Sequence, residues 1–361
     1  MSRKIIYCVG FRVDDNHGKS RATRQKFLSL RKLFDESYFI SLRRKGSKVV
    51  GLLLLEFQLL HTIVRVKPDV VITRGFTGYF SRLYCKVLKI LFVREVHADI
   101  ISEADLLDKS LISKCIIKTL GRIYLPLEKG ADKIIFNHPS LMDYFVSKYQ
   151  FNSTNCFFVY NGFGPKDDVI LTEPSNFNKY FNSKFLNCVF VGAASKWHGV
   201  EYIVRVAKEL DKQDIPIRFI MAGGKIETPL PSNMVNITPL DADGCNQLVS
   251  MSDVCLLPVN NNRVSPGSPL KLYDYIANGK YILTQENVAG YSDEVKKYGF
   301  GDSVDFTNTK DSAKFLVNLL ERYKSNGNLL LNKDEFSIDQ FSWDTRMKEW
   351  VDDIFSNRGK C

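Results

Sequence analysis

The chain contains 361 residues, of which 45% are hydrophobic and 25% are charged. This balance is typical of a globular protein with enough apolar side chains for two domains. It excludes a disordered chain, a collagen-like fibre and a disulfide-stapled miniprotein. Net charge is +10, but residues 1–165 hold 27 Lys or Arg against 14 Asp or Glu, whereas residues 166–361 hold 23 against 26. We therefore expect two domains with different partners, and an anionic partner for the first.

In the first half, apolar strand-like runs alternate with helical patterns. We expect strands at residues 4–10, 37–42, 68–75, 91–99, 132–138 and 156–162, and helices at 20–34, 48–66, 79–90, 112–129 and 140–149. Ser140 is the expected N-cap of the last helix. A polar segment with two prolines, residues 164–185, then interrupts the alternation and indicates a domain boundary.

The longest apolar stretch is residues 49–66. It is interrupted by Glu56, Gln58, His61 and Arg65. We therefore predict an amphipathic core helix there and not a transmembrane span.

The alternation resumes in the second half. We expect strands at residues 185–192, 217–224, 234–240, 253–259 and 280–285, and helices at 200–210, 245–252, 269–278, 311–324 and within 341–355. Repeated strand–helix units predict an α/β protein made of two Rossmann-like domains, each a parallel sheet covered by helices on both faces. Ligands of such sheets bind at the carboxyl ends of the strands, so we expect a site in a cleft between facing domains.

The eight cysteines include no CxxC pair, and most lie inside apolar runs. They are typical of small core residues in a reducing compartment. The N-terminus shows no signal-peptide pattern. We expect a cytoplasmic protein, or one bound peripherally at the inner face of the cell membrane.

Residues 268–280 read S-P-L-K-L-Y-D-Y-I-A-N-G-K. Ser268 is the expected N-cap and Pro269 the first helical residue, so the first-turn amides and Lys271 can bind a phosphate. Asp274 shares a helix face with Leu270 and Lys271, and its carboxylate could accept hydrogen bonds from a ribose. The alternative is an ordinary capped helix with solvated charges.

This stretch resembles the donor-site motif of the family 4 (group 1) retaining glycosyltransferases of the GT-B fold. A second stretch, V-F-V-G-A-A-S-K-W-H-G at residues 189–199, resembles the strand–loop–helix that opens the family's donor domain. The weaker matches are F-I-M-A-G-G, whose glycines end a strand, and T-P-L, which lies where the family's base-binding loop falls. The resemblance implies these donor-binding residues: Gly192, His198, Gly199, Gly223, Gly224, Thr238, Leu240, Ser268, Pro269, Leu270 and Asp274.

Several positions depart from the family pattern, including His198, which takes the place of a usual Lys, and Gly18, which stands alone where two glycines are usual. Asp274 replaces the usual Glu, and Ala193 stands where Arg is common. Pro266 replaces a carboxylate that normally contacts the donor sugar. Sugar recognition must therefore differ here, or the protein binds a nucleotide sugar without turning it over.

In the first half the resemblance is looser. His97 ends a strand and could position a hydroxyl or share a proton near the donor sugar, and Glu95 is a second candidate from the same segment. Gly18, Lys19 and Arg21 follow the first strand, where the family's first loop borders the acceptor. Further cations could meet an anionic membrane: Arg24, Arg43, Arg44 and Lys45. A structural role for His97 and solvated helix faces for the cations are the alternatives.

The resemblance implies a hexosyltransferase-like enzyme with His97, Lys196 and Lys271 in catalytic roles. Residues 1–168 and a returning helix at 341–361 would form the acceptor-side domain, and residues 169–340 the donor domain. The enzyme would move a sugar from a UDP- or GDP-linked donor, with retention, to a glycan or polyprenyl-linked acceptor. We expect no metal requirement and no nucleic-acid partner, and a role in cell-surface polysaccharide or glycolipid biosynthesis. The alternative is a non-catalytic nucleotide-sugar-binding or scaffold subunit of a glycan assembly complex.

Overall fold

The computed structural model describes residues 3–13, 18–42, 48–107, 109–164, 177–194, 196–260, 266–327, 329 and 337–355. The chain divides into two compact units. Unit 1 comprises Met1–Pro165, Val264–Gly267 and Asp339–Cys361, and unit 2 comprises Lys166–Arg263 and Ser268–Ile338. The boundary expected between residues 168 and 169 lies outside the described residues, as do Arg43, Arg44 and Lys45.

Unit 1 contains a six-stranded parallel sheet in the order β2-β1-β3-β4-β5-β6. Its strands are β1 (Lys4–Val9), β2 (Glu36–Ser41), β3 (Val70–Arg74), β4 (Leu91–Val96), β5 (Lys133–Phe136) and β6 (Cys156–Phe158). The register pairs Ile5 with Ser37 of β2 and with Val70 of β3. Central strands such as β1 are apolar without interruption because both faces of the sheet are covered.

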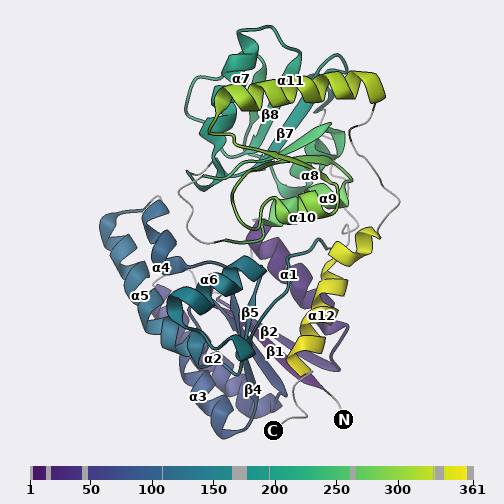
Figure 1. The fold of residues 1–361 in the computed structure, drawn as a ribbon. Helices are drawn as coiled ribbons and strands as arrows, with labels where there is room; N and C mark the ends of the chain where they lie inside the picture. The colour runs from purple at the N-terminus through teal and green to yellow at the C-terminus, as the bar shows by residue number, and fades with distance from the viewer. Residues whose placement is uncertain are drawn as a thin grey trace. The chain divides into compact units, whose positions relative to one another are not determined.

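Helices cover both faces of this sheet (Figure 1). One face carries α1 (Gly18–Arg31) and α12 (Trp343–Phe355), which pack against each other. The other carries α2 (Lys48–Val66), α3 (Tyr79–Val87), α5 (Leu111–Lys129) and α6 (Pro139–Tyr149), and a short α4 (Ile100–Glu103) precedes α5. Trp350 of α12 is buried with its ring centroid 6.3 Å from that of Tyr7 in β1. The C-terminal helix thus returns to unit 1, as expected.

Unit 2 contains a second six-stranded parallel sheet in the order β12-β11-β10-β7-β8-β9. Its strands are β7 (Leu186–Gly192), β8 (Ile217–Gly223), β9 (Met234–Ile237), β10 (Val254–Leu257), β11 (Tyr281–Gln285) and β12 (Gly301–Val304). Helices α7 (Val200–Asp211) and α11 (Thr309–Asn326) cover one face, and α8 (Ala242–Met251), α9 (Leu270–Ala277) and α10 (Asp293–Lys297) lie on the other (Figure 1). Short 3₁₀ turns occur at Ala104–Leu106, Ser153–Asn155, Phe177–Tyr180, Lys196–His198 and Ile338–Phe341.

The structure corrects several details of the sequence-based expectations. The N-cap of α6 is His138, whose Nδ1 accepts from the amide of Ser140, so Ser140 is not the cap. The elements α4, α10 and β12 were not expected, because each is too short to establish a period.

Helix α2 corrects the expectation about the apolar stretch. Over Val49–Val66 it is long and apolar enough to cross a membrane on length and composition alone, so its polar residues do not disqualify it. Such a helix is also compatible with the core of a globular domain. Leu55, Leu59 and Ile63 lie in the core of unit 1, as expected of a core helix. The helix is not amphipathic in the expected way, because Leu53, Leu54 and Phe57 are exposed on its outward side.

Candidate functional site

The topology of unit 2 creates a crevice at the carboxyl ends of β7 and β10. These strands are neighbours, yet the chain leaves β7 toward α7 on one face and leaves β10 toward α9 on the other. Adjacent loops that diverge in this way form the ligand-binding crevice of open α/β sheets. Several expected donor-binding residues lie there.

Glycines shape the floor of this crevice. Gly192 ends β7 with φ +141°, and Gly223 ends β8 with φ +103°. The amide of Gly224 donates to the Gly192 carbonyl at 3.0 Å. A Cβ atom at Gly224 would lie 2.0 Å from the amide nitrogen of Ala194, so no other residue fits there. The glycines therefore let the ends of β7 and β8 and the loop after β7 pack closely against one another.

Lys271 reaches this floor from the first turn of α9. Its Nζ is buried, and it has no hydrogen-bond partner among the residues that the structure describes. The atom lies 4.1 Å from the ring centroid of Phe190, and a Cβ at Gly192 would lie 2.7 Å from it. Burial lowers the pKa of Lys271 to about 7. A bound anion would compensate this buried cation, so the arrangement fits a phosphate.

The start of α9 differs from the expected capping pattern. Pro269 occupies the N-cap position, and no side chain caps the helix there. The Ser268 hydroxyl is buried and lies 2.6 Å from the Tyr273 hydroxyl, which donates to Glu294. Ser268 is therefore not the N-cap that the sequence suggested. Its side chain belongs to a buried hydrogen-bonded chain under the helix.

Tyr275 holds α9 in place against the sheet. Its hydroxyl accepts from the amide of Val191 at 3.3 Å and donates to the carbonyl of Leu256 at 3.2 Å. The helix is thus tied to β7 and β10 together. Asp274 is half-buried beside Lys271 on the same helix, and its charge acts to raise the pKa of that lysine.

The remaining donor-side candidates surround the same strand ends. The Thr238 hydroxyl donates to the carbonyl of Gly223 at 3.2 Å, and Leu240 packs against Gly244 at the start of α8. The His198 ring centroid lies 6.0 Å from that of Phe190. Gly199 begins α7 with φ +56°. The side chain of Lys196 lies outside the described part of the chain.

In unit 1, Glu95 is the centre of a buried polar cluster. Its Oε2 accepts from the Tyr7 hydroxyl at 2.6 Å, and its Oε1 accepts from Lys26 and from His97 Nε2, the latter at 2.5 Å. Burial alone would raise the pKa of this carboxyl. The charge of Lys26, the hydrogen bond from His97 and the charge of Arg74 instead hold the pKa well below its usual range. Glu95 is therefore ionised and fully engaged in holding its neighbours.

His97 is neutral in this cluster. Burial and the charge of Arg74 lower its pKa to about 3, despite the opposing effect of Glu95. Since the Glu95 carboxylate accepts from Nε2, the proton is on Nε2, and Nδ1 is left as an acceptor 3.5 Å from the Asn137 amide nitrogen. At neutral pH, His97 Nδ1 accepts a hydrogen bond, and Asn137 is its donor in this structure. A substrate hydroxyl would have to replace Asn137 there.

Five further residues belong to this cluster and were not predicted from the sequence: Tyr7, Lys26, Asn137, Trp343 and Trp350. With His97 and Glu95, all of these except Tyr7 line a small cavity of about 10 Å³, close to the volume that holds one water. A signal for Lys26 did exist. Lys26 is spaced from Ala22 and Ser29 so that all three lie on one buried stripe of α1. A lysine in such a position needs a negatively charged partner.

The acceptor-side candidates lie at the start of α1, next to the carboxyl end of β1. Gly18 and Lys19 are exposed, and Lys19 Nζ lies 3.6 Å from the ring centroid of Phe11. Arg21 is half-buried. Arg24 donates to the carbonyl of Val13 at 3.2 Å, so it is partly used in shaping the loop.

Across the described ranges, no group of three or more His, Cys, Asp or Glu side chains is arranged to hold a metal ion. The groups available for chemistry near Lys271 in unit 2 and around Glu95 in unit 1 are hydrogen-bonding and cationic side chains.

Comparison with known proteins establishes the fold. No family model matches the chain, and no curated protein sequence matches it. Sucrose-phosphate synthase from Thermosynechococcus elongatus superposes with a TM-score of 0.68 at 12% identity over 98% of this chain and 99% of that one. A glycosyltransferase from Rickettsia africae gives 0.68 at 16% over 99% of both chains. The UDP-GlcNAc 2-epimerase of Neisseria meningitidis, solved with UDP-GlcNAc, gives 0.56 at 14% over 98% of this chain and 100% of that one. The chain therefore has the GT-B fold.

Proposed function

We propose that the protein is a glycosyltransferase that moves a sugar from a nucleotide-diphosphate donor to a hydroxyl acceptor. The observation that carries this proposal is the buried ammonium of Lys271 at the glycine-lined end of β7, which has no hydrogen-bond partner among the described residues. Burying such a charged group costs free energy unless an anion pairs with it. The diphosphate of a nucleotide sugar supplies that anion, and proteins of this fold, including the epimerase solved with UDP-GlcNAc, support the assignment.

The donor is a UDP- or GDP-linked sugar held by unit 2. Lys271, Lys196 and the first-turn amides of α9 at Leu270 and Lys271 bind the diphosphate, near Gly192, His198 and Gly199. Pro269 and the buried Ser268 hold the start of that helix in place. Asp274 binds the ribose hydroxyls. The backbone near Thr238 and Leu240 edges the base, and Gly223 and Gly224 allow the close backbone packing that shapes this end of the sheet. The cations take the place of a metal, so no metal is required.

In the reaction, the bond between C1 of the sugar and the β-phosphate oxygen breaks, and the acceptor hydroxyl oxygen bonds to C1 with retention. The hydroxyl proton passes to the departing diphosphate, whose developing charge is stabilised by Lys196 and Lys271. His97 in unit 1 accepts a hydrogen bond through Nδ1 and orients a sugar hydroxyl. Glu95 fixes the tautomer of His97.

The acceptor is a glycan or a polyprenyl-linked sugar in cell-surface polysaccharide or glycolipid biosynthesis. Gly18, Lys19 and Arg21 border it, since they lie at the carboxyl edge of the unit 1 sheet. A lipid-linked acceptor requires that the protein work in the cytoplasm at the inner face of the cell membrane. The basic composition of the first half supports that placement.

The first test is donor binding. Calorimetric titration with UDP, GDP and their sugars should show micromolar affinity for one base, and Lys271→Met should weaken it by about 10- to 100-fold. Lys314→Met, which removes an exposed lysine of α11, should leave affinity unchanged. No binding of any nucleotide, or equal affinity in both variants, would refute the proposal.

The second candidate is a nucleotide-sugar-binding subunit without turnover. Pro266 favours it, since this position in similar glycosyltransferases carries a carboxylate that contacts the sugar. Incubating the protein with the bound donor and membrane-lipid extract, followed by mass spectrometry and proton NMR of the sugar, separates the candidates. A new glycoside supports transfer, an inverted sugar centre supports epimerisation, and an unchanged donor supports binding alone.

A further inference from the structure

Helix α2 of unit 1 exposes an apolar stripe that the fold does not explain. The exposed side chains are Val49, Val50, Leu53, Leu54, Phe57 and Val64. They recur every three or four residues, so they share one side of the helix, while the opposite stripe packs on the sheet. A helix that covers a sheet normally turns polar residues outward. The outward stripe therefore serves something other than the core.

The exposed apolar surface continues over two neighbouring helices. On α3 it comprises Tyr79, Phe80, Leu83 and Val87, and on α5 it comprises Leu111, Ile112, Ile116 and Ile123. Helix α3 packs against both α2 and α5, and Figure 1 shows all three on the same side of the unit 1 sheet. We call the exposed apolar side chains of α2, α3 and α5 the apolar face. Phe57, Val87 and Leu111 are 68%, 78% and 79% exposed, and continuous patches of this kind mark interaction sites.

The exposed charged side chains of α2, α3 and α5 are all positive. The only acidic residues of α2, α3 and α5 are Glu56 and Glu128. Glu56 is buried and accepts from the amides of Gly78 and Ser81, both at 2.7 Å, and Glu128 pairs with Arg94. The basic residues of the three helices include Arg65, Lys86, Arg122 and Lys129, which are exposed. The apolar face is thus interspersed with cations and lacks an exposed carboxylate on its own helices.

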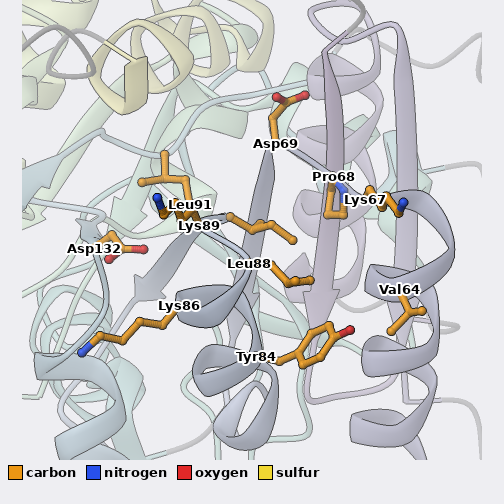
Figure 2. A pocket seen from close by; sticks show the side chains of 11 residues that line it. Val64, Lys67, Pro68, Asp69, Tyr84, Lys86, Leu88, Lys89, Leu91 and Asp132 are labelled. Atoms are coloured by element: carbon orange, nitrogen blue, oxygen red, sulfur yellow. The ribbon is translucent and has the colours of Figure 1, made fainter. Parts of the chain in front are cut away.

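A pocket of about 730 Å³ adjoins this surface at the C-terminal ends of α2 and α3 (Figure 2). Val64 of the apolar face and Leu88 line it, together with Lys67, Lys86 and Lys89. The pocket also contains Asp69 and Asp132, which accept from the amides of Lys4 and Phe92 at 2.9 and 2.8 Å. Its three lysines outnumber these two carboxylates, so its net charge is positive. The three lysines have no ion pair within the described ranges, so the pocket can receive an anionic group.

We propose that the apolar face docks on a lipid bilayer that contains anionic lipids, with headgroups entering the lysine-lined pocket. Apolar side chains with surrounding Lys and Arg are the composition of a surface that lies in the interface of a membrane. The helices lie on the membrane and do not cross it, because the other side of α2 packs on the sheet. This inference deepens the proposed membrane-side function and rests on it, but it does not depend on the transfer reaction.

Charge favours a membrane over a second copy of the chain. A symmetric dimer through this surface would place the same cations against each other, with no exposed carboxylate of these helices to pair them. An anionic bilayer provides both the apolar interior and the counter-charge. The surface also differs from the basic segment near residues 43–45 that the sequence suggested, which lies outside the described residues.

The test is vesicle co-sedimentation of the full chain. Vesicles of phosphatidylcholine with one third phosphatidylglycerol should bind the protein at least about tenfold more strongly than pure phosphatidylcholine, and high salt should weaken this binding. The triple variant Phe57→Ser, Leu111→Ser, Ile112→Ser should lower binding by at least about tenfold. The double variant Lys86→Glu, Lys89→Glu should abolish the preference for anionic vesicles.

Leu28→Ser is the matched control, because Leu28 is an exposed apolar residue of α1 on the opposite side of the sheet. It should bind vesicles as the unaltered protein does. Calorimetric nucleotide binding by all variants, which the surface changes should not affect, shows that they fold and tests the donor site separately. No vesicle binding by the unaltered protein, binding retained by the triple variant, or a dimer that the triple variant dissociates would each overturn the inference.

Discussion

The ammonium group of Lys271 lies 4.1 Å from the ring centroid of Phe190, and both belong to unit 2. The aromatic face attracts this buried Nζ, and no hydrogen-bond acceptor reaches it within the described ranges. A lysine held in this way is poised for an anion. The absence of a side chain at Gly192 is what lets the Lys271 ammonium lie against the end of β7.

Replacing Lys271 with Met should separate stability from binding. Met removes the buried amine but keeps the apolar stem, so the unliganded protein should gain about 1 kcal/mol in free energy of unfolding. The same change should remove most of the thermal stabilisation given by nucleotide. Thermal melts with and without UDP or GDP measure both effects. A variant that is less stable and still responds fully to nucleotide would contradict the role given to Lys271.

Nucleotide binding should take up protons above neutral pH. Burial lowers the pKa of Lys271 to about 7, so about 0.9 of these side chains are neutral at pH 8 in the free protein. A diphosphate beside the amine raises its pKa, so binding at pH 8 should take up nearly one proton. Titration calorimetry in buffers of different ionisation enthalpy measures this number. Lys271→Met should show almost no uptake.

The period of the apolar pattern was sufficient to predict the parallel sheets, because long strand–helix units dominate the fold. The stretch around Lys271 was also identifiable, since its signals lie within one helix. Ser268 shows the limit of local patterns. From the sequence, its hydroxyl could either cap the helix or form a hydrogen bond with Tyr273. The structure shows the second, because Tyr273 also donates to the buried Glu294, which lies 26 residues later in the chain.

The cluster in unit 1 could not be derived from the sequence, because its members are far apart along the chain. Lys26 and Glu95 are separated by 69 residues and meet only when α1 packs on the sheet. The apolar pattern predicted that His97 lies at the end of a strand. It could not predict that His97 is neutral, because that state depends on burial and on the charge of Arg74.

Substitution of Gly192 should weaken nucleotide binding directly, in addition to any loss of folding stability. A Cβ there would lie 2.7 Å from Lys271 Nζ, in a backbone conformation with φ +141°. Gly192→Ala should displace the lysine and weaken nucleotide affinity by about tenfold or more. Gly279→Ala is the control, since Gly279 also has positive φ, +59°, but nothing lies within 4 Å of its Cβ. It should cost about 1 kcal/mol of stability and leave affinity unchanged.

Acid should destabilise unit 1 through His97. Its pKa falls from 6.5 in the unfolded chain to about 3 in the folded protein, so between these values the unfolded state binds one more proton. Folding stability should therefore fall with decreasing pH by about 1.4 kcal/mol per unit from this group. Urea unfolding at pH 7 and pH 5 measures the slope. His97→Asn should flatten it by nearly one proton, and an unchanged slope would show that the imidazole is not buried in its neutral form.

Breaking the ion pair between Lys26 and Glu95 should destabilise unit 1 strongly. Both side chains are almost fully buried, and Lys26→Met leaves the carboxylate hydrogen-bonded to Tyr7 and neutral His97, with the charge of Arg74 as its remaining cationic support. The expected loss is about 3–5 kcal/mol, because the uncompensated charge stays buried. Lys32→Met, which removes an exposed pair with Asp344, should cost less than about 1 kcal/mol.

The loss for Lys26→Met should also depend on pH. Because the missing positive charge no longer lowers the pKa of Glu95, the loss should shrink as pH falls and the carboxyl protonates. Urea unfolding of both variants from pH 7 to pH 4 measures this. A loss for Lys26→Met that stays constant with pH would show that packing against Trp343 and Trp350, and not charge, is what Lys26 contributes.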